Sequence, residues 1–307
     1  MSDIAIIGEC MLELARDRSR PRGQRSVPMM LRYGGDTLNT AVYLARAGIS
    51  VCYATALGDD IYSDWLLSEW QSEGVDCTFV LRAPRRVPGL YMITTSESGE
   101  RSFHYWRGES QARELFSASS PDDEYLARLG AHSMIYLTGI TLSLYDDAGR
   151  ARLFGFLADY KGKGGRIAFD INYRPAGWQH RDTAREAIDR AYTLSDIALA
   201  SHEDEVALYG DDDVDAIVAR IRQQGVSEIV VKAGGKWCWL FDGDHCERVE
   251  LGELQDPVDT TAAGDSFNAG YLAARLRGES AAGALQSGHA LASRVVMHPG
   301  AILPREE

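Results

Sequence analysis

The sequence predicts an α/β fold in which helices cover both faces of a mostly parallel central sheet, together with a small β-rich insertion. Short apolar runs alternate with segments whose apolar residues have helical spacing, and this alternation is typical of a parallel sheet. The alternation stops between about residues 75 and 108, where no helical segment separates three β-rich stretches. A chain of 307 residues is long enough for one large domain with a small appendage.

The N-terminal part begins with a strand that we expect to be buried on both faces. Ile4–Ile7 is a short apolar run closed by Gly8. A helix is predicted after the Gly34-Gly35 pair, because apolar residues follow at helical spacing as far as Gly48. The next predicted elements are a strand at 51–56 and a helix at about 62–73.

The β-rich insertion predicts a small antiparallel sheet. Its stretches are Phe79–Leu81, Leu90–Ile93 and Ser102–Trp106, with turns expected at Pro88-Gly89 and Ser98-Gly99.

After the insertion the alternation of strands and helices returns. Strands are predicted at 134–137, 167–170, 197–200 and 229–232, and helices at about 146–161, 182–194, 214–224, 265–276 and 281–295. Because ligands of such folds bind beyond the carboxyl ends of the strands, we expect the functional site at that edge of the sheet.

Charge and composition argue against several classes of partner. The net charge of −13 and the sequence pI of about 5.0 disfavour binding to nucleic acid or to anionic membranes. The five cysteines form no C-x-x-C pair and the histidines have no zinc-binding spacing, which predicts free thiols in a reducing compartment. The N-terminus lacks a basic region followed by a long apolar core, so we expect the protein in the cytoplasm.

The sequence DTTAAGDSFNAG at 259–270 predicts an anion site at the start of a helix. Ala262, Ala263 and Gly264 are small enough to leave backbone N–H groups open, and a helix N-terminus adds partial positive charge. Asp265 at the rim of this site can accept a proton from a hydroxyl that attacks a phosphoryl group. Taken alone, the motif leaves open that Asp265 merely caps the helix. Neither a P-loop nor a G-x-G-x-x-G dinucleotide motif is present.

This string resembles the C-terminal signature of the ribokinase-like, or PfkB, carbohydrate kinases. The N-terminal signature of that family, G-G-x-x-x-N, is matched by Gly34 to Asn39. The resemblance covers essentially the whole chain. It implies a single ribokinase-like domain over 1–307, with a small β lid from approximately 10–33 and 75–108. It also implies transfer of the γ-phosphoryl group of ATP, with Mg²⁺, to a sugar alcohol. Asp265 matches the catalytic base of the family, and Ala262, Ala263 and Gly264 match its anion hole.

Within the family the chain is most similar to the 2-keto-3-deoxygluconate kinases. The similarity is carried by IGECM at 7–11, YGGDTLN at 33–39, PGLY at 88–91, GERSFHYWR at 99–107 and DINYRP at 170–175. It implies that sugar hydroxyls are held by Gly35, Asp36 and Asn39, within the stretch that also holds Thr37 and Leu38. It further implies a substrate pocket lined by Tyr91, Tyr105, Arg107 and Arg174. A guanidinium group is suited to the carboxylate of such a sugar acid.

The resemblance also implies a nucleotide site. The residues expected there are Asn172, Arg174, Ser201, Lys232, Gly234, Gly235, Lys236 and Gly264. Ser201-x-x-Asp204 stands where many family members have N-x-x-E, which leaves the Mg²⁺ shell open. Asp259 and Thr261 lie in a loop that can help to bind a monovalent cation such as K⁺ in relatives.

The residues leave other functions open. The first alternative is the same chemistry on fructose or ribose, and the second is a sugar-binding regulator without catalysis. Acceptance of the galactonate epimer is also left open. A homo-oligomer is expected only by analogy with the family.

Overall fold

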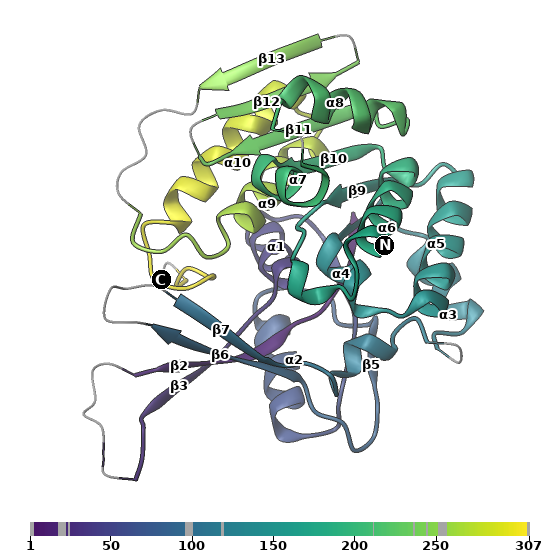
Figure 1. Cartoon of the computed structure of the whole chain (residues 1–307). Helices are drawn as coiled ribbons and strands as arrows, with labels where there is room; N and C mark the ends of the chain where they lie inside the picture. Colours follow the sequence, from purple (N-terminus) through teal and green to yellow (C-terminus); the bar gives the residue numbers. More distant parts are fainter. Residues whose placement is uncertain are drawn as a thin grey trace.

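The structure is a computed structural model that describes residues 3–17, 23, 25–95, 101–117, 120–210, 212–235, 237–243, 245–250 and 257–305. Its centre is a nine-stranded sheet in the order β13-β12-β11-β10-β9-β8-β1-β4-β5 (Figure 1). The strands from β5 to β11 in this sheet pair in parallel, whereas β12 and β13 are antiparallel. In chain order the strands are β1 (Ile4–Ile7), β4 (Val51–Leu57), β5 (Val80–Arg82), β8 (Met134–Thr138), β9 (Arg166–Asp170), β10 (Ile197–Ser201), β11 (Glu228–Ala233), β12 (Trp237–Asp242) and β13 (His245–Glu250).

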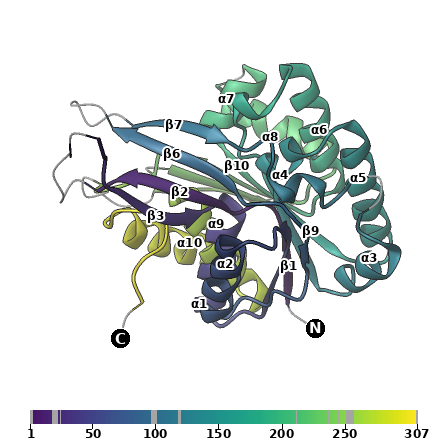
Figure 2. The ribbon, with the colours of Figure 1, turned by 90° about the horizontal axis from the view of Figure 1, so that it is seen from below.

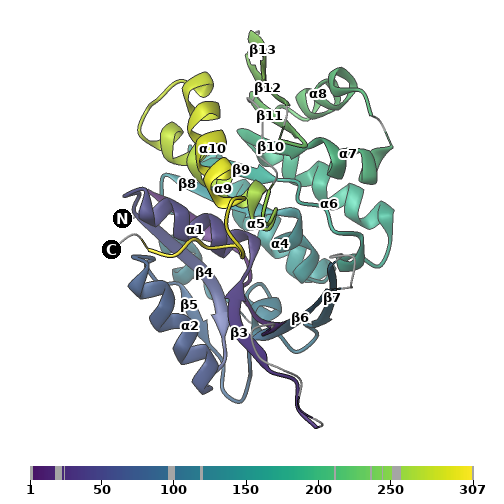
Figure 3. The same ribbon diagram turned by 90° about the vertical axis from the view of Figure 1, so that its left-hand side faces the viewer.

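Helices cover both faces of this sheet, as the alternation predicts (Figure 3). One face packs against α1 (Asp36–Arg46), α2 (Ile61–Ser72), α9 (Ala263–Leu276) and α10 (Ala281–Val295). The other face packs against α3 (Asp123–Leu129), α4 (Gly139–Leu144), α5 (Asp147–Gly162), α6 (Arg181–Leu194), α7 (His202–Tyr209) and α8 (Val214–Gln223), with the short 3₁₀ segment η1 (Gln111–Glu114). A second 3₁₀ segment, η2, spans Pro175–Gly177.

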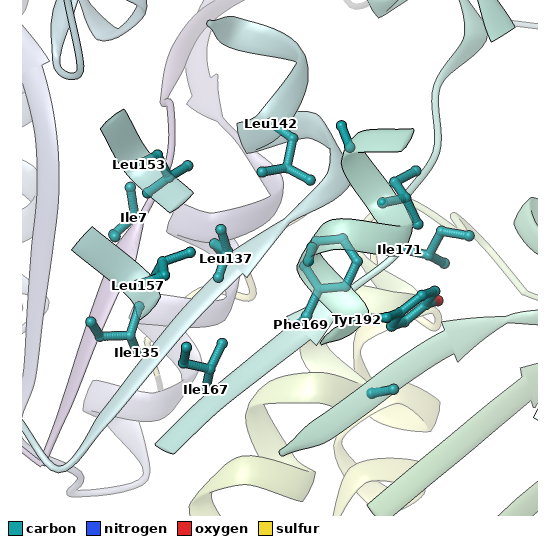
Figure 4. Packing of buried hydrophobic residues seen from close by; sticks show 14 of the residues in the cluster. Ile7, Ile135, Leu137, Leu142, Leu153, Leu157, Ile167, Phe169, Ile171 and Tyr192 are labelled. Atoms are coloured by element: carbon teal, nitrogen blue, oxygen red, sulfur yellow. The ribbon is translucent and has the colours of Figure 1, made fainter. Parts of the chain in front are cut away.

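Alternation of side chains along the strands explains why the apolar runs are continuous. In β1, Ala5 and Ile7 belong to one buried cluster, whereas Ile4 and Ile6 belong to the cluster on the opposite face. Successive side chains of a strand point to opposite faces, so a strand covered twice needs apolar residues at every position. Figure 4 shows the first cluster, in which β1, β8 and β9 pack against α4, α5 and α6.

The β-rich insertion forms part of a separate four-stranded sheet in the order β3-β2-β6-β7. Its strands are β2 (Met11–Arg16), β3 (Met29–Gly34), β6 (Gly89–Thr95) and β7 (Arg101–Trp106). Figure 2 shows this sheet projecting from one end of the molecule. Two details differ from expectation. The sheet is mixed, because β2 and β6 pair in parallel, and Val80–Arg82 joins the large sheet beside β4. The expected turn at Ser98-Gly99 lies outside the described residues.

Several elements had no counterpart among the predicted ones. The helices α3, α4 and α7 have only 7, 6 and 8 residues, too few for a clear helical period. The hairpin β12–β13 follows β11 without a helix, so the alternation gave no signal for it. In the described part of the chain, no helix is both long and apolar enough to span a membrane.

Candidate active site

A cavity of about 630 Å³ opens at the carboxyl ends of the central strands. Its lining includes Asp36 and Asp265 as well as His289 and Ser293 on α10. The cavity also includes Gly234 and the start of α9. It therefore lies where parallel α/β sheets bind ligands, and it brings together residues from both ends of the sequence.

The N-terminus of α9 offers open backbone donors to this cavity. Ala262 precedes the helix with a left-handed φ of 61°, and no side chain caps the helix. The amide of Ala263 donates to the carbonyl of Thr260 at 3.2 Å. Within the described residues, the amides of Gly264 and Asp265 have no such partner. The predicted anion hole is therefore centred on these two N–H groups, and Ala262 and Ala263 shape the turn that exposes them.

Asp265 lies at the rim of this hole in contact with α1. Its Oδ2 accepts a hydrogen bond of 2.8 Å from Nδ2 of Asn39, while Oδ1 of Asn39 is buried without a protein partner. Burial and then the charge of Asp36 raise the pKa of Asp265 to about 7. A carboxyl group with this pKa is able to exchange a proton near neutral pH.

Asp36 is held by two donors on the same oxygen. Its Oδ2 accepts hydrogen bonds from Oγ1 of Thr138 at 2.6 Å and from Nδ2 of Asn172 at 2.9 Å. Burial raises the pKa of Asp36, and the bond from Thr138 and the charge of Arg107 oppose this rise. The arrangement fixes the carboxyl group of Asp36 at the start of α1, where it lines the cavity.

A buried polar cluster that the sequence did not reveal locks α9 to the sheet. Asn268 donates to Oδ2 of Asp170 at 2.7 Å and to the hydroxyl of Tyr136 at 3.1 Å, and its Oδ1 accepts from Nζ of Lys232 at 2.9 Å. Lys232 also lies 3.6 Å from Oδ1 of Asp170. A Cβ atom on Gly264 would stand 4.0 Å from Nζ of Lys232. The ammonium group is therefore close to the anion hole, as expected for a phosphate contact.

The predicted sugar contacts on the small sheet are held by two glutamates that sequence reasoning missed. The hydroxyl of Tyr91 donates to Oε2 of Glu13 at 2.5 Å, and Nε of Arg107 donates to Oε2 of Glu9. Both glutamates are buried. Tyr105 is exposed, and its ring lies 6.0 Å from that of Tyr91. One signal could have identified Glu9: in IGECM it is a charged residue directly after an apolar strand, where a buried carboxylate is unusual.

Arg174 lines the cavity near Ser201 and Asp204, which are among the residues predicted on the nucleotide side. Its Nη1 donates to Oδ1 of Asp204 at 2.9 Å, and both residues line the cavity together with Ser201. Gly234 and Gly235 also line it, with left-handed φ values of 55° and 71°. The remaining expected nucleotide residue, Lys236, lies outside the described residues.

The loop before α9 is organised by Asp259. Its Oδ1 accepts from the amide of Thr261 at 3.0 Å and from Oγ1 of Thr261 at 2.7 Å, and its Oδ2 accepts from the amide of Gly300 at 2.8 Å. Asp259 is buried. These bonds tie the loop to the C-terminal segment and hold it in place beside the anion hole.

The acidic residues of the cavity fit a weakly held magnesium ion. Among the described residues no cluster of three or more metal-ligating side chains occurs, while the cavity is lined by the acidic residues Asp36, Asp170, Glu203, Asp204 and Asp265. Magnesium in phosphoryl-transfer sites is commonly held by one or two carboxylates, water and the phosphates of the substrate. The donor set therefore suits a magnesium ion that arrives with a nucleotide.

Comparison with known proteins agrees with this geometry. The model of the pfkB family of carbohydrate kinases matches residues 1–307. The chain is 41% identical over 312 residues to a 2-dehydro-3-deoxygluconokinase of Dickeya dadantii, covering 99% of this chain and 97% of that protein. A protein of the same name from Escherichia coli K12 is 40% identical over 310 residues, again covering 99% and 97%.

Solved structures share the fold. A PfkB protein from Polaromonas sp. JS666 superposes with a TM-score of 0.84 at 25% identity, covering 97% of this chain and 96% of that one. A putative ribokinase II from E. coli in complex with ATP and Mg²⁺ superposes with a TM-score of 0.83 at 22% identity, covering 98% and 94%.

Proposed function

Because the chain belongs to the pfkB family of carbohydrate kinases, we propose that it transfers the γ-phosphoryl group of ATP to the C6 hydroxyl of 2-keto-3-deoxy-D-gluconate, which is also called 2-dehydro-3-deoxy-D-gluconate. The single observation that carries the chemistry is the placement of Asp265, with a pKa raised to about 7, beside the open amides at the start of α9. The relatives of about 40% identity support the choice of substrate.

In the proposed reaction Asp265 accepts the proton of the C6 hydroxyl as that oxygen attacks the γ-phosphorus. The bond between the γ-phosphorus and its bridging oxygen breaks, and ADP leaves. The amides of Gly264 and Asp265 and the ammonium group of Lys232 stabilise the negative charge on the transferring group. Bound Mg²⁺ supplies further charge neutralisation at the phosphates.

The sugar is oriented by α1 and by the small sheet. Asp36 and Asn39 hold hydroxyl groups, with Oδ1 of Asn39 as an unused acceptor, and Arg107 binds the carboxylate. We propose that the small sheet acts as a lid that excludes water, since ATP hydrolysis is the competing reaction.

The test is a coupled assay of ADP release with 2-keto-3-deoxygluconate, its galactonate epimer, fructose and ribose as acceptors. We expect the sugar acid to be the best acceptor and Asp265→Asn to lower its turnover by about 10³-fold while sugar binding is kept. Efficient use of fructose with no use of the sugar acid would replace the proposed substrate. Unchanged turnover of Asp265→Asn would remove Asp265 from its role as base.

Three further properties are proposed and can be checked on the same protein. A comparison of the activity in K⁺ with that in Na⁺ tests whether the Asp259–Thr261 loop binds a monovalent cation.

Light scattering tests the expected homo-oligomer. A cytoplasmic location is supported by the five cysteines, all of which are free, and cell fractionation tests it.

A further inference from the structure

The ion pair between Glu9 and Arg107 is incomplete when it is compared with two other glutamate–arginine pairs in the described part of the chain. Arg46 and Arg275 each use both Nε and Nη2 to contact the two oxygens of one glutamate, at 2.7 to 3.0 Å. Arg107 contacts Glu9 through Nε alone. Its Nη2 and Oε1 of Glu9 are both buried without a hydrogen-bond partner.

Another incompletely paired arginine has a different explanation. Arg220 contacts Glu205 through Nη2, and its remaining nitrogens lack partners. Its guanidinium, however, lies 3.4 Å from the ring centroid of Tyr209, which compensates the charge in another way. No aromatic ring covers Arg107 within the described residues. A guanidinium N–H group that is buried without an acceptor is costly to keep unless a ligand supplies the acceptor.

The location of the pair connects it to the sugar site. Glu9 follows β1, and a Cβ atom on Gly35 would approach its carbonyl oxygen to 2.3 Å. Arg107 follows β7, and its charge acts on Asp36. The pair therefore joins the large sheet to the small sheet beside the residues that hold the sugar.

The electrostatics of this region require such an arrangement. Glu9, Glu13, Asp36 and Asp265 place four carboxyl groups around the sugar site, and a sugar acid adds a fifth. A mobile arginine side chain could form an ion pair with any of these carboxylates, because each of them attracts the guanidinium group. A buried carboxylate that occupies Nε fixes the guanidinium plane and leaves the edge formed by its two terminal nitrogens for bidentate binding.

We infer that Glu9 is a positioning residue that holds Arg107 through Nε so that its terminal nitrogens face the carboxylate of the substrate. The inference rests on the proposed sugar-acid substrate. Glu9 does not contact the substrate in this arrangement, so it affects substrate binding only through the position of Arg107.

The experiment is a double-mutant cycle on the full-length enzyme with 2-keto-3-deoxygluconate and ATP as substrates. Glu9→Ala is expected to raise the KM for the sugar acid at least tenfold, with kcat and the KM for ATP within threefold of wild type. Glu9→Gln keeps an acceptor for Nε and is expected to restore a KM near that of wild type. In the Arg107→Ala background, Glu9→Ala is expected to add little, because the group it positions is gone.

Either of two results with Glu9→Ala would overturn the inference. If the effects of Glu9→Ala and Arg107→Ala on KM add fully, Glu9 does not act through Arg107. If Glu9→Ala lowers the KM, Glu9 competes with the substrate for Arg107 instead of positioning it. Should Glu9→Ala fail to fold, Glu9→Asp tests the same point, because its shorter side chain keeps the charge but withdraws from Nε; an unchanged KM would then overturn the inference.

A matched control separates positioning from stability. Glu228 is also buried and paired with an arginine, Arg275, at the far end of α9. Glu228→Gln is expected to lower the melting temperature and leave the KM for the sugar acid unchanged. A wild-type enzyme that does not phosphorylate the sugar acid overturns the proposed function as well, whereas an active wild type with additive variants overturns only the role of Glu9.

Discussion

The protonation of Asp265 is set by its immediate neighbours. Burial and the nearby carboxyl group of Asp36 disfavour its charged form, while the hydrogen bond from Asn39 and the charge of Lys232 favour that form. The first two effects outweigh the last two, and the pKa of Asp265 is raised to about 7. A carboxyl group with a pKa in this range can accept and release a proton near neutral pH, which suits the proposed role of Asp265 as the base.

We predict that kcat/KM for the sugar acid rises with pH through a midpoint near 7, because only the carboxylate form of Asp265 accepts the proton. Asp36→Asn removes the neighbouring negative charge, so the midpoint is expected to move to lower pH although sugar binding also weakens. Initial rates measured from about pH 5.5 to about pH 8.5 give the midpoint for the wild type and for Asp36→Asn. A midpoint that stays in place in Asp36→Asn would contradict the coupling between the two carboxyl groups.

At the scale of elements, the first turn of α9 holds the residues to which we assign the phosphoryl-transfer chemistry. The left-handed turn at Ala262 starts the helix without a side-chain cap. Gly264 follows, and a Cβ atom there would meet only Nζ of Lys232, at 4.0 Å. No contact within the described part of the folded protein therefore requires glycine at position 264, and we propose that the approach of a ligand does.

We predict that Gly264→Ala keeps the fold but lowers kcat by about 10²-fold, because the methyl group stands between the transferring phosphoryl group and its donors. The melting temperature is expected to stay the same or to rise slightly, since alanine favours a helix. Gly283→Ala is the matched control, because Gly283 lies in the first turn of α10 with ordinary contacts of 3.4 Å or more. Wild-type turnover in Gly264→Ala would exclude the proposed approach of the phosphoryl group.

The contrast between α9 and the small sheet shows what the sequence makes predictable. The DTTAAGDSFNAG string marks the start of a helix, its donors and its base, because all of these lie within one continuous stretch. The partners of Asn268 lie on three different strands. The parallel pairing of β2 with β6 joins Glu13 to Tyr91 across 78 positions. Such contacts are set by topology and register, which local patterns do not encode.

At the scale of the molecule, the chain passes between the two sheets at four places. These are the connections from β1 to β2, from β3 to α1, from β5 to β6 and from β7 to η1. The first two are short and touch each other, because Gly35 lies against the carbonyl of Glu9. We propose that these two connections act as the hinge of the lid, next to the residues that we assign to the sugar.

We predict that joint binding of the sugar acid and a non-hydrolysable ATP analogue slows amide hydrogen exchange in β2 and β6, because closure reduces the opening of the small sheet. The helix α5, on the far face of the large sheet, serves as the internal reference and is expected to exchange as before. Exchange in β2 and β6 that is the same with and without both ligands would contradict a closing lid.

The anchoring of Asn268 has a consequence for how such an enzyme changes over evolutionary time. The second turn of α9 is tied to β8, β9 and β11 through Tyr136, Asp170 and Lys232, so the base and the anion hole move with the large sheet as one block. The proposed contacts to the acid end of the sugar come from β6 and β7 instead. If the proposed roles hold, mutations in these two strands are expected to change the acceptor and to leave the part of the enzyme assigned to ATP unchanged.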